Sequence, residues 1–312
     1  MRPLEGVGIA FCGGGFRSFA EVAVLEDMER NNVRVAAAAG TSMGSMVAAL
    51  VAAEVPAARI ADLLLAMDRR VVDAGLLKNL KLRVLNLASN NGLLDNAAIE
   101  EQTRILLDEA GISTFADLKK PLAVPAVDIL TGELCVFTNE PELFSDETGG
   151  WTVIPGDHDL VKVLCASASY PLAIQPTSYA GRLFMDGGCR MNLPTPLFDR
   201  AAVDAVVGVG MIREFKPLEV VNPLTIAQRT MSYGARQLDR ISALSADLYV
   251  NLPVSGEDAF QAGSGATVMA EARQMLVDHP VDWTQVRPGI IESLKRAATG
   301  SIANMFRGSS AS

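Results

Sequence analysis

The chain has 312 residues, enough for a large hydrophobic core, and we expect one domain or one domain with an addition. Hydrophobic residues make up 49% and charged residues 20% of the chain, a globular composition that excludes a disordered protein. The formal net charge of −9 excludes a general nucleic-acid binder, because such a protein needs a basic face.

No apolar run reaches the ~18 residues of a membrane span, so we expect no transmembrane helix. The segment Met1–Gly6 has no long apolar core, which predicts no signal peptide and a cytoplasmic location. Without C-x-x-C spacing, the cysteines predict reduced thiols and no zinc site. They are Cys12, Cys135, Cys165 and Cys189.

In chain order, Gly6–Phe11 reads as a strand and about Phe19–Glu29 as a helix, joined by the glycine-rich segment Cys12–Ser18. A glycine turn that opens a helix exposes backbone N–H groups at the positive end of the helix dipole, which suits an anion. A dinucleotide fits poorly, because Ser18 stands where the third glycine of G-x-G-x-x-G would be, and a Walker loop lacks its lysine. An oxyanion hole or a structural turn remains.

The stretch Val33–Val51 reads as a buried strand followed by a helix, and the link between them is Gly40–Gly44, a G-x-S-x-G sequence. Between a strand and a helix this pattern is typical of a nucleophile elbow, which presents the serine, here Ser42, on a sharp turn. The alternative is a tight turn whose serine caps the helix.

Asp186 follows a predicted strand at Arg182–Met185 and precedes two glycines. This pattern places a carboxylate at the carboxyl end of a strand, where open α/β sheets bind ligands. An ordinary Asx-Gly turn is the alternative.

The remaining chain alternates predicted strands and helices, which indicates a layered α/β fold with a largely parallel sheet. Leu122–Ile129 and Leu134–Thr138 predict a hairpin, and Glu140–Asp157 predicts a loop. The other predicted strands are Ala205–Met211 and Asp247–Leu252. Further helices are predicted at Pro56–Met67, Leu94–Ala110, Asp159–Ala168, Thr225–Ile241, Thr267–Val277 and Ile290–Phe306.

Four segments together resemble the patatin-like phospholipase family, in matching order and approximate spacing across Gly6–Met211. They are Cys12–Ser18, Gly40–Gly44, Ala166–Pro171 and Phe184–Pro194. One departure is Ser18, where the family usually has glycine. We therefore expect a catalytic core at residues 6–211 and a C-terminal extension at 212–312, packed on the same domain.

The resemblance implies a lipid acyl hydrolase in which Ser42 attacks an acyl ester and Asp186 takes its proton directly. It also implies an oxyanion hole formed by Gly13, Gly14 and Gly15. Arg17 is a candidate for a substrate phosphate or for bracing the loop. The expected partner is a lipid ester, with peripheral membrane contact, no nucleic acid, no cofactor and no metal.

Two histidines keep a Ser–His–Asp triad open, since Ser42, Asp186 and His279 follow the chain order of α/β-hydrolases. His279 reads as a surface helix end and His158 as a loop or cap residue. A non-catalytic lipid-binding module and acyl transfer to another alcohol are further alternatives.

The segment Arg69–Leu94 is locally basic and rich in leucine. It is either a helix packed on the body or a cap over Ser42 that touches lipid. In the second case, Lys78, Lys81 and Arg83 would contact anionic lipid.

Overall fold

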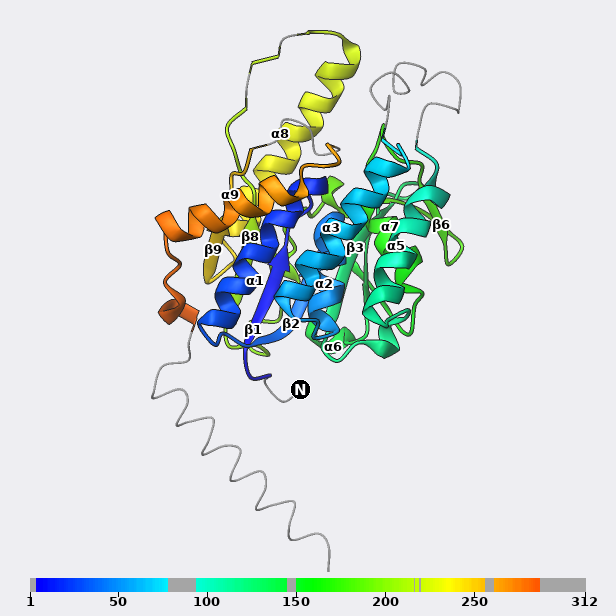
Figure 1. Ribbon diagram of the computed structural model, residues 1–312. Coiled ribbons are helices and arrows are strands. Elements are labelled where there is room, and N and C mark those ends of the chain that lie inside the picture. Colours follow the sequence, from blue (N-terminus) through cyan, green and yellow to red (C-terminus); the bar gives the residue numbers. More distant parts are fainter. Residues whose placement is uncertain are drawn as a thin grey trace, which may run out of the picture.

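A computed structural model of the chain describes residues 4–77, 94–144, 150–215, 217–218, 220–255 and 261–286. Figure 1 shows a central sheet with helices packed against it. The strands are β1 (Val7–Phe11), β2 (Val35–Gly40), β3 (Leu122–Asp128), β4 (Leu134–Thr138), β5 (Thr152–Pro155), β6 (Thr177–Tyr179), β7 (Arg182–Asp186), β8 (Val206–Gly210) and β9 (Leu248–Asn251). The α-helices are α1 (Glu21–Arg30), α2 (Met43–Ala52), α3 (Ala57–Asp73), α5 (Asn96–Ala110), α6 (Pro141–Phe144), α7 (Leu160–Ala168), α8 (Pro223–Ala243) and α9 (Gly265–Asp278).

The main path of the sheet has the strand order β5-β4-β3-β2-β1-β8-β9. The five strands from β3 to β9 along this path are parallel to one another, as the alternation of strands and helices predicts. The strand β4 is antiparallel to β3, and β5 is parallel to β4. The fold is therefore a layered α/β fold with a mostly parallel sheet.

The strand β3 has two partners along one edge, and this arrangement positions the site. Its first residues pair with β2, and its last residues, 126–128, pair with β7 in the antiparallel direction. The carboxyl ends of β2 and β7 therefore point toward each other alongside β3. Asp186 is the last residue of β7, so its expected position at the carboxyl end of a strand is confirmed, although β7 itself runs antiparallel to β3.

Each face of the sheet carries its own hydrophobic core. Ile9 and Phe11 of β1 join a core with α1, α2, α3, α7 and α9, whereas Ala10 lies in a second core on the opposite face. This alternation follows from strand geometry, since successive side chains point to opposite faces. The second core includes α6 and the chain between β7 and β8, and Ala243 at the end of α8 packs against it.

Most predicted elements are confirmed with ends shifted by a few residues, including the hairpin of β3 and β4. The loop predicted at Glu140–Asp157 is wrong, because this stretch contains α6 and β5. Both elements are only four residues long, which is too short for a periodic pattern to be visible. The helix predicted at Pro56–Met67 is longer than expected and continues to Asp73.

The C-terminal part of the described chain adds to both the sheet and its covering layer. The strand β9 extends the sheet next to β8, and Val268 and Met269 of α9 lie in the same core as β1. The division into residues 6–211 and 212–312 stays a prediction.

Two predicted segments fall outside the described residues. They are the basic part of the cap segment, with Lys78, Lys81 and Arg83, and the helix at Ile290–Phe306. Among the helices that the structure describes, none combines the length and the apolar character that crossing a bilayer requires.

Candidate active site

Ser42 lies on a strained turn between β2 and α2, with φ 54° and ψ −129°. A positive φ is costly for a residue with a side chain and persists only where the surrounding structure enforces it. A Cβ atom on Gly40 would lie 2.2 Å from the carbonyl oxygen of Gly44, and one on Gly44 would lie 2.5 Å from that of Cys12. The two glycines are therefore needed for this turn. The Ser42 side chain makes no capping hydrogen bond to α2, which argues against the capping-serine interpretation.

The backbone of Ser42 is held by Ser167, at the end of α7. The Ser42 N–H donates to Ser167 Oγ at 2.9 Å, and that hydroxyl donates to the Pro125 carbonyl at 2.7 Å. Ser167 is fully buried, so it links the turn to β3 without contact with water. The segment Ala166–Pro171 signalled the family in the sequence, but its spacing gave no role for Ser167.

Asp186 ends β7 and is only 3% exposed. Burial raises the pKa of its carboxyl to about 6, while hydrogen bonds with the Gly188 N–H and the Ser42 side chain act in the opposite direction. The Gly188 N–H lies 2.7 Å from Asp186 Oδ1. The structure thus brings Ser42 and Asp186 together, with a carboxyl that binds a proton more readily than an exposed aspartate does.

The close approach of these two side chains depends on the turn after β7. A Cβ atom on Gly187 would lie 2.3 Å from the Pro125 carbonyl oxygen and 3.2 Å from the Thr41 side chain. The Thr41 hydroxyl also donates to the Met191 carbonyl at 2.9 Å. Glycine after Asp186 therefore lets its turn pack directly against the turn that carries Ser42.

The glycine-rich loop lies on another side of Ser42. A Cβ atom on Gly13 would lie 3.0 Å from the Ser42 Cβ, so this loop is adjacent to the hydroxyl. The Gly13 N–H already donates to the Asn192 carbonyl at 3.2 Å. Within the described part of the chain, the N–H groups of Gly14 and Gly15 donate to no protein group. Of the three predicted donors, Gly14 and Gly15 have free N–H groups.

Arg17 and Ser18 stabilise this loop from within. The Arg17 Nε donates to the Gly14 carbonyl at 3.2 Å, which matches the bracing role considered for this residue. The Ser18 hydroxyl is buried and donates to the Cys12 carbonyl at 3.2 Å. A serine at this position is therefore accommodated by a hydrogen bond.

Asn192 and Asp239 are site-associated residues that sequence reasoning missed. Asn192 Nδ2 donates to the Gly13 carbonyl at 3.3 Å and to Asp239 Oδ2, on α8, at 3.0 Å. Asp239 Oδ1 is buried with no partner in the described structure, and burial raises the pKa of this carboxyl to about 6. No local sequence signal links residues 192 and 239, because the contact depends on where α8 returns to the sheet.

Neither histidine makes a hydrogen bond with Ser42 or Asp186 in the described structure. His158 Nδ1 lies 3.3 Å from the Tyr179 hydroxyl, its Nε2 lies 3.2 Å from the Ile154 carbonyl, and its ring packs on Phe137. His279 is exposed at the end of α9. Both positions match the surface-end and loop interpretations made from the sequence. All four cysteines are free, as predicted.

Two proteins without a described function are similar to this chain in sequence. The uncharacterized protein YqhO of Bacillus subtilis (strain 168) is 28% identical over 207 residues, which cover 64% of this chain and 69% of YqhO. The uncharacterized protein R571 of Acanthamoeba polyphaga mimivirus is 26% identical over 209 residues, which cover 64% of each protein.

Two solved structures show a weaker similarity. VipD from Legionella pneumophila matches with a TM-score of 0.41 and 14% identity, over 88% of this chain and 66% of VipD. The type III effector ExoU of Pseudomonas aeruginosa matches with a TM-score of 0.41 and 18% identity, over 89% of this chain and 53% of ExoU. The chain therefore spans only part of the length of these proteins.

The profile of one protein family, described as patatin-like phospholipase, matches residues 9–199. This range contains the glycine-rich loop, the turn with Ser42, the segment with Ser167 and the turn after Asp186. The match covers more than half of the chain. The chain therefore belongs to the patatin-like phospholipase family, a family of lipid hydrolases.

Proposed function

We propose that the chain is a lipid acyl hydrolase of the phospholipase A or lysophospholipase type, in which Ser42 and Asp186 form a catalytic dyad. The observation that carries this proposal is the closeness of the two side chains: the Ser42 side chain acts on the buried Asp186 carboxyl and lowers its pKa, and the turn after Asp186 packs against the turn that carries Ser42. The strained φ of Ser42 supports it, because such strain is concentrated at functional sites.

In the proposed reaction, Ser42 Oγ attacks the carbonyl carbon of a lipid ester while its proton moves to Asp186. An ordinary aspartate is a weak base for an alcohol, and the raised pKa of Asp186 makes the transfer easier. Collapse of the tetrahedral intermediate breaks the ester bond, and the leaving alcohol takes the proton from Asp186. Water then attacks the acyl-serine, giving its proton to Asp186, and the fatty acid leaves as Ser42 regains its proton.

The developing oxyanion needs hydrogen-bond donors that are already in place. We assign this role to the N–H groups of Gly14 and Gly15, because they lie in the loop beside Ser42 and have no protein partner among the described residues. Gly13 would join them only by giving up its bond to Asn192. Loss of one such donor typically costs about 10²–10³ in rate.

A panel of phospholipids, lysophospholipids, acylglycerols and a short-chain ester, assayed with the wild type, Ser42→Ala and Asp186→Asn, tests the proposal. We expect each substitution to lower kcat by at least about 10³-fold, with an unchanged circular dichroism spectrum. The matched controls are Ser178→Ala and Asp62→Asn, which change the same residue types at exposed positions.

Other outcomes of the same panel identify the alternatives. Substantial activity in Ser42→Ala or Asp186→Asn would contradict the dyad. A loss above ~10³-fold in His279→Ala without unfolding would favour a triad. An inactive wild type that still binds lipid would favour a binding module, and ester products with an added alcohol would favour acyl transfer. The cytoplasmic location stays a prediction.

A further inference from the structure

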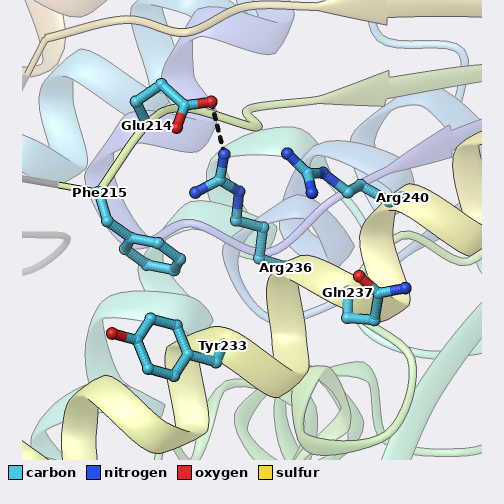
Figure 2. A pocket seen from close by; sticks show the side chains of 6 residues that line it. All are labelled: Glu214, Phe215, Tyr233, Arg236, Gln237 and Arg240. Atoms are coloured by element: carbon cyan, nitrogen blue, oxygen red, sulfur yellow. Dashed lines mark hydrogen bonds and ion pairs between the residues drawn. The ribbon is translucent and has the colours of Figure 1, made fainter.

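A pocket of about 350 Å³ lies along α8, outside the four segments that carry the family resemblance. Its lining combines two arginines with aromatic and amide side chains, as Figure 2 shows. The lining residues are Glu214, Phe215, Tyr233, Arg236, Gln237 and Arg240, and we call this site the α8 pocket.

Arg236 has hydrogen-bonding capacity that the described protein leaves unused. Its Nη2 pairs with Glu214 at 2.7 Å, and its guanidinium lies 4.7 Å from the centre of the Phe215 ring. Its Nε is buried without a partner. The aromatic ring fixes the guanidinium from one side, which is a common way to orient an arginine toward an anion.

Arg240 lies one helical turn after Arg236 and is exposed, with no hydrogen bond or ion pair to any other described residue. Both guanidinium groups face the α8 pocket in Figure 2. Like charges four residues apart on a helix repel each other. Glu214 offsets the charge of Arg236 alone, so an anion bound beside Arg240 would remove the rest of this repulsion. Two guanidinium groups with a phenol and an amide nearby suit a phosphate group.

The segment that leads into α8, together with the first turn of that helix, points to a lipid as the source of this phosphate. Val220, Val221 and Ile226 have exposed fractions of 62%, 70% and 51%. Figure 1 shows the N-terminal half of α8 projecting beyond the other described helices. An exposed apolar tip at the start of the helix that carries the two arginines suits contact with a lipid surface, whereas binding of a free phosphate needs no apolar tip.

The α8 pocket is also linked to the candidate active site. Asp239 lies between the two arginines in the sequence of α8 and accepts a hydrogen bond from Asn192 Nδ2. The same Nδ2 donates to the carbonyl of Gly13, in the loop beside Ser42. A lipid phosphate bound in the pocket would therefore be held on the helix that is linked through Asn192 to the glycine-rich loop beside Ser42.

We propose that the α8 pocket binds the head-group phosphate of a phospholipid substrate at a lipid surface, with Arg236 and Arg240 as its ligands. The pocket makes phospholipid esters the preferred substrates over acylglycerols, which lack a phosphate. The preferred turnover of phospholipids over acylglycerols rests on the hydrolase activity proposed above. The binding of the head-group phosphate in the α8 pocket does not depend on that activity.

The turnover test compares phosphatidic acid with diacylglycerol of the same acyl chains in neutral detergent micelles. In Arg240→Gln we expect the ratio of kcat/KM for phosphatidic acid to that for diacylglycerol to fall about tenfold. Arg240→Lys keeps the charge and should keep part of the ratio. The matched control is Arg273→Gln on α9, whose ion pair with Glu26 lies elsewhere on the surface. An unchanged ratio in Arg240→Gln, or an equal fall in Arg273→Gln, would overturn the proposal.

The binding test uses Ser42→Ala protein and beads coated with a neutral glycolipid film that carries either phosphatidic acid or diacylglycerol. We expect about tenfold tighter binding to the film with phosphatidic acid, and loss of that preference when Arg240→Gln is added. This result can be obtained even if the chain hydrolyses no ester. The binding test therefore distinguishes a failure of the α8 pocket proposal from a failure of the proposed hydrolase activity. Equal binding to both films, together with tight binding of inorganic phosphate, would overturn the assignment to a lipid.

Discussion

At the scale of single residues, the candidate site contains two carboxyl groups with different surroundings, the buried Asp186 and the partly buried Asp239. Burial raises the pKa of Asp186 and of Asp239 to about 6 in each case. Hydrogen bonds from the Gly188 N–H and Asn192 Nδ2 offset only part of this cost. Ionisation of these carboxyl groups therefore makes the folded chain less stable, a cost that the proposed role of Asp186 as a base would explain.

The raised pKa of Asp186 predicts a pH-dependent effect of Asp186→Asn on stability. Between the ordinary value of 3.8 and about 6, the folded chain binds more protons than the unfolded chain, so ionisation of Asp186 destabilises the fold as the pH rises. We expect Asp186→Asn to raise the free energy of unfolding by up to about 3 kcal/mol at pH 8 and by little at pH 4. Urea denaturation at both pH values measures this.

Asp62→Asn, which changes an exposed carboxylate on α3, is the control and should show no such difference between the two pH values. If Asp186→Asn had the same effect at pH 4 and pH 8, the raised pKa of this carboxyl would be contradicted.

At the scale of elements, the local sequence predicted the secondary structure of most segments and the parallel part of the sheet. It did not predict every contact between distant segments. The turn at Ser42 was predictable because Gly40 and Gly44 are needed within five residues of one another. The antiparallel direction of β7 was not, because strand residues carry no signal of the direction of a distant partner. The contact between Asp239 and Asn192 was hidden for the same reason, since it joins residues far apart in the sequence.

The position of α8 predicts that Asp239 orients the glycine-rich loop beside Ser42 through Asn192. We expect Asp239→Ala to lower kcat about tenfold with little change in KM, because loop donors act mainly on the transition state. Asp239→Asn keeps an oxygen acceptor for Asn192 Nδ2 and should restore most of kcat. Kinetics on a soluble short-chain ester measure both values.

The control is Thr230→Ala on the same helix, since among the described residues the Thr230 hydroxyl bonds the Ile226 carbonyl and no other group. Full kcat in Asp239→Ala, or an equal loss in Thr230→Ala, would show that this contact does not position the loop.

At the scale of the whole molecule, the described chain beyond the family match continues the same core. Arg273 of α9 pairs with Glu26 of α1, and Trp283 Nε1 donates to Asp27 at 2.7 Å. Asp68 of α3 is 4% exposed and accepts the N–H groups of Gly263 at 2.6 Å and Gly265 at 2.9 Å. The Asp68 bonds join the start of α9 to α3, and the bonds of Arg273 and Trp283 join the C-terminal part to α1. Composition and periodicity do not reveal these contacts.

Asp68→Ala therefore tests whether the C-terminal part unfolds with the rest of the chain. The substitution leaves two backbone N–H groups without their acceptor, and we expect a loss of about 3 kcal/mol in the free energy of unfolding. Because the sequence holds two tryptophans, Trp283 alone reports on the C-terminal part in a Trp151→Phe background. If residues 212–312 pack on the same domain, tryptophan fluorescence and far-ultraviolet circular dichroism will show one coincident transition, at a lower denaturant concentration in Asp68→Ala. Asp62→Asn on the same helix should not shift the midpoint. Earlier unfolding at Trp283 alone would instead mean that the C-terminal part is a separate cooperative unit, held to the core by Asp68.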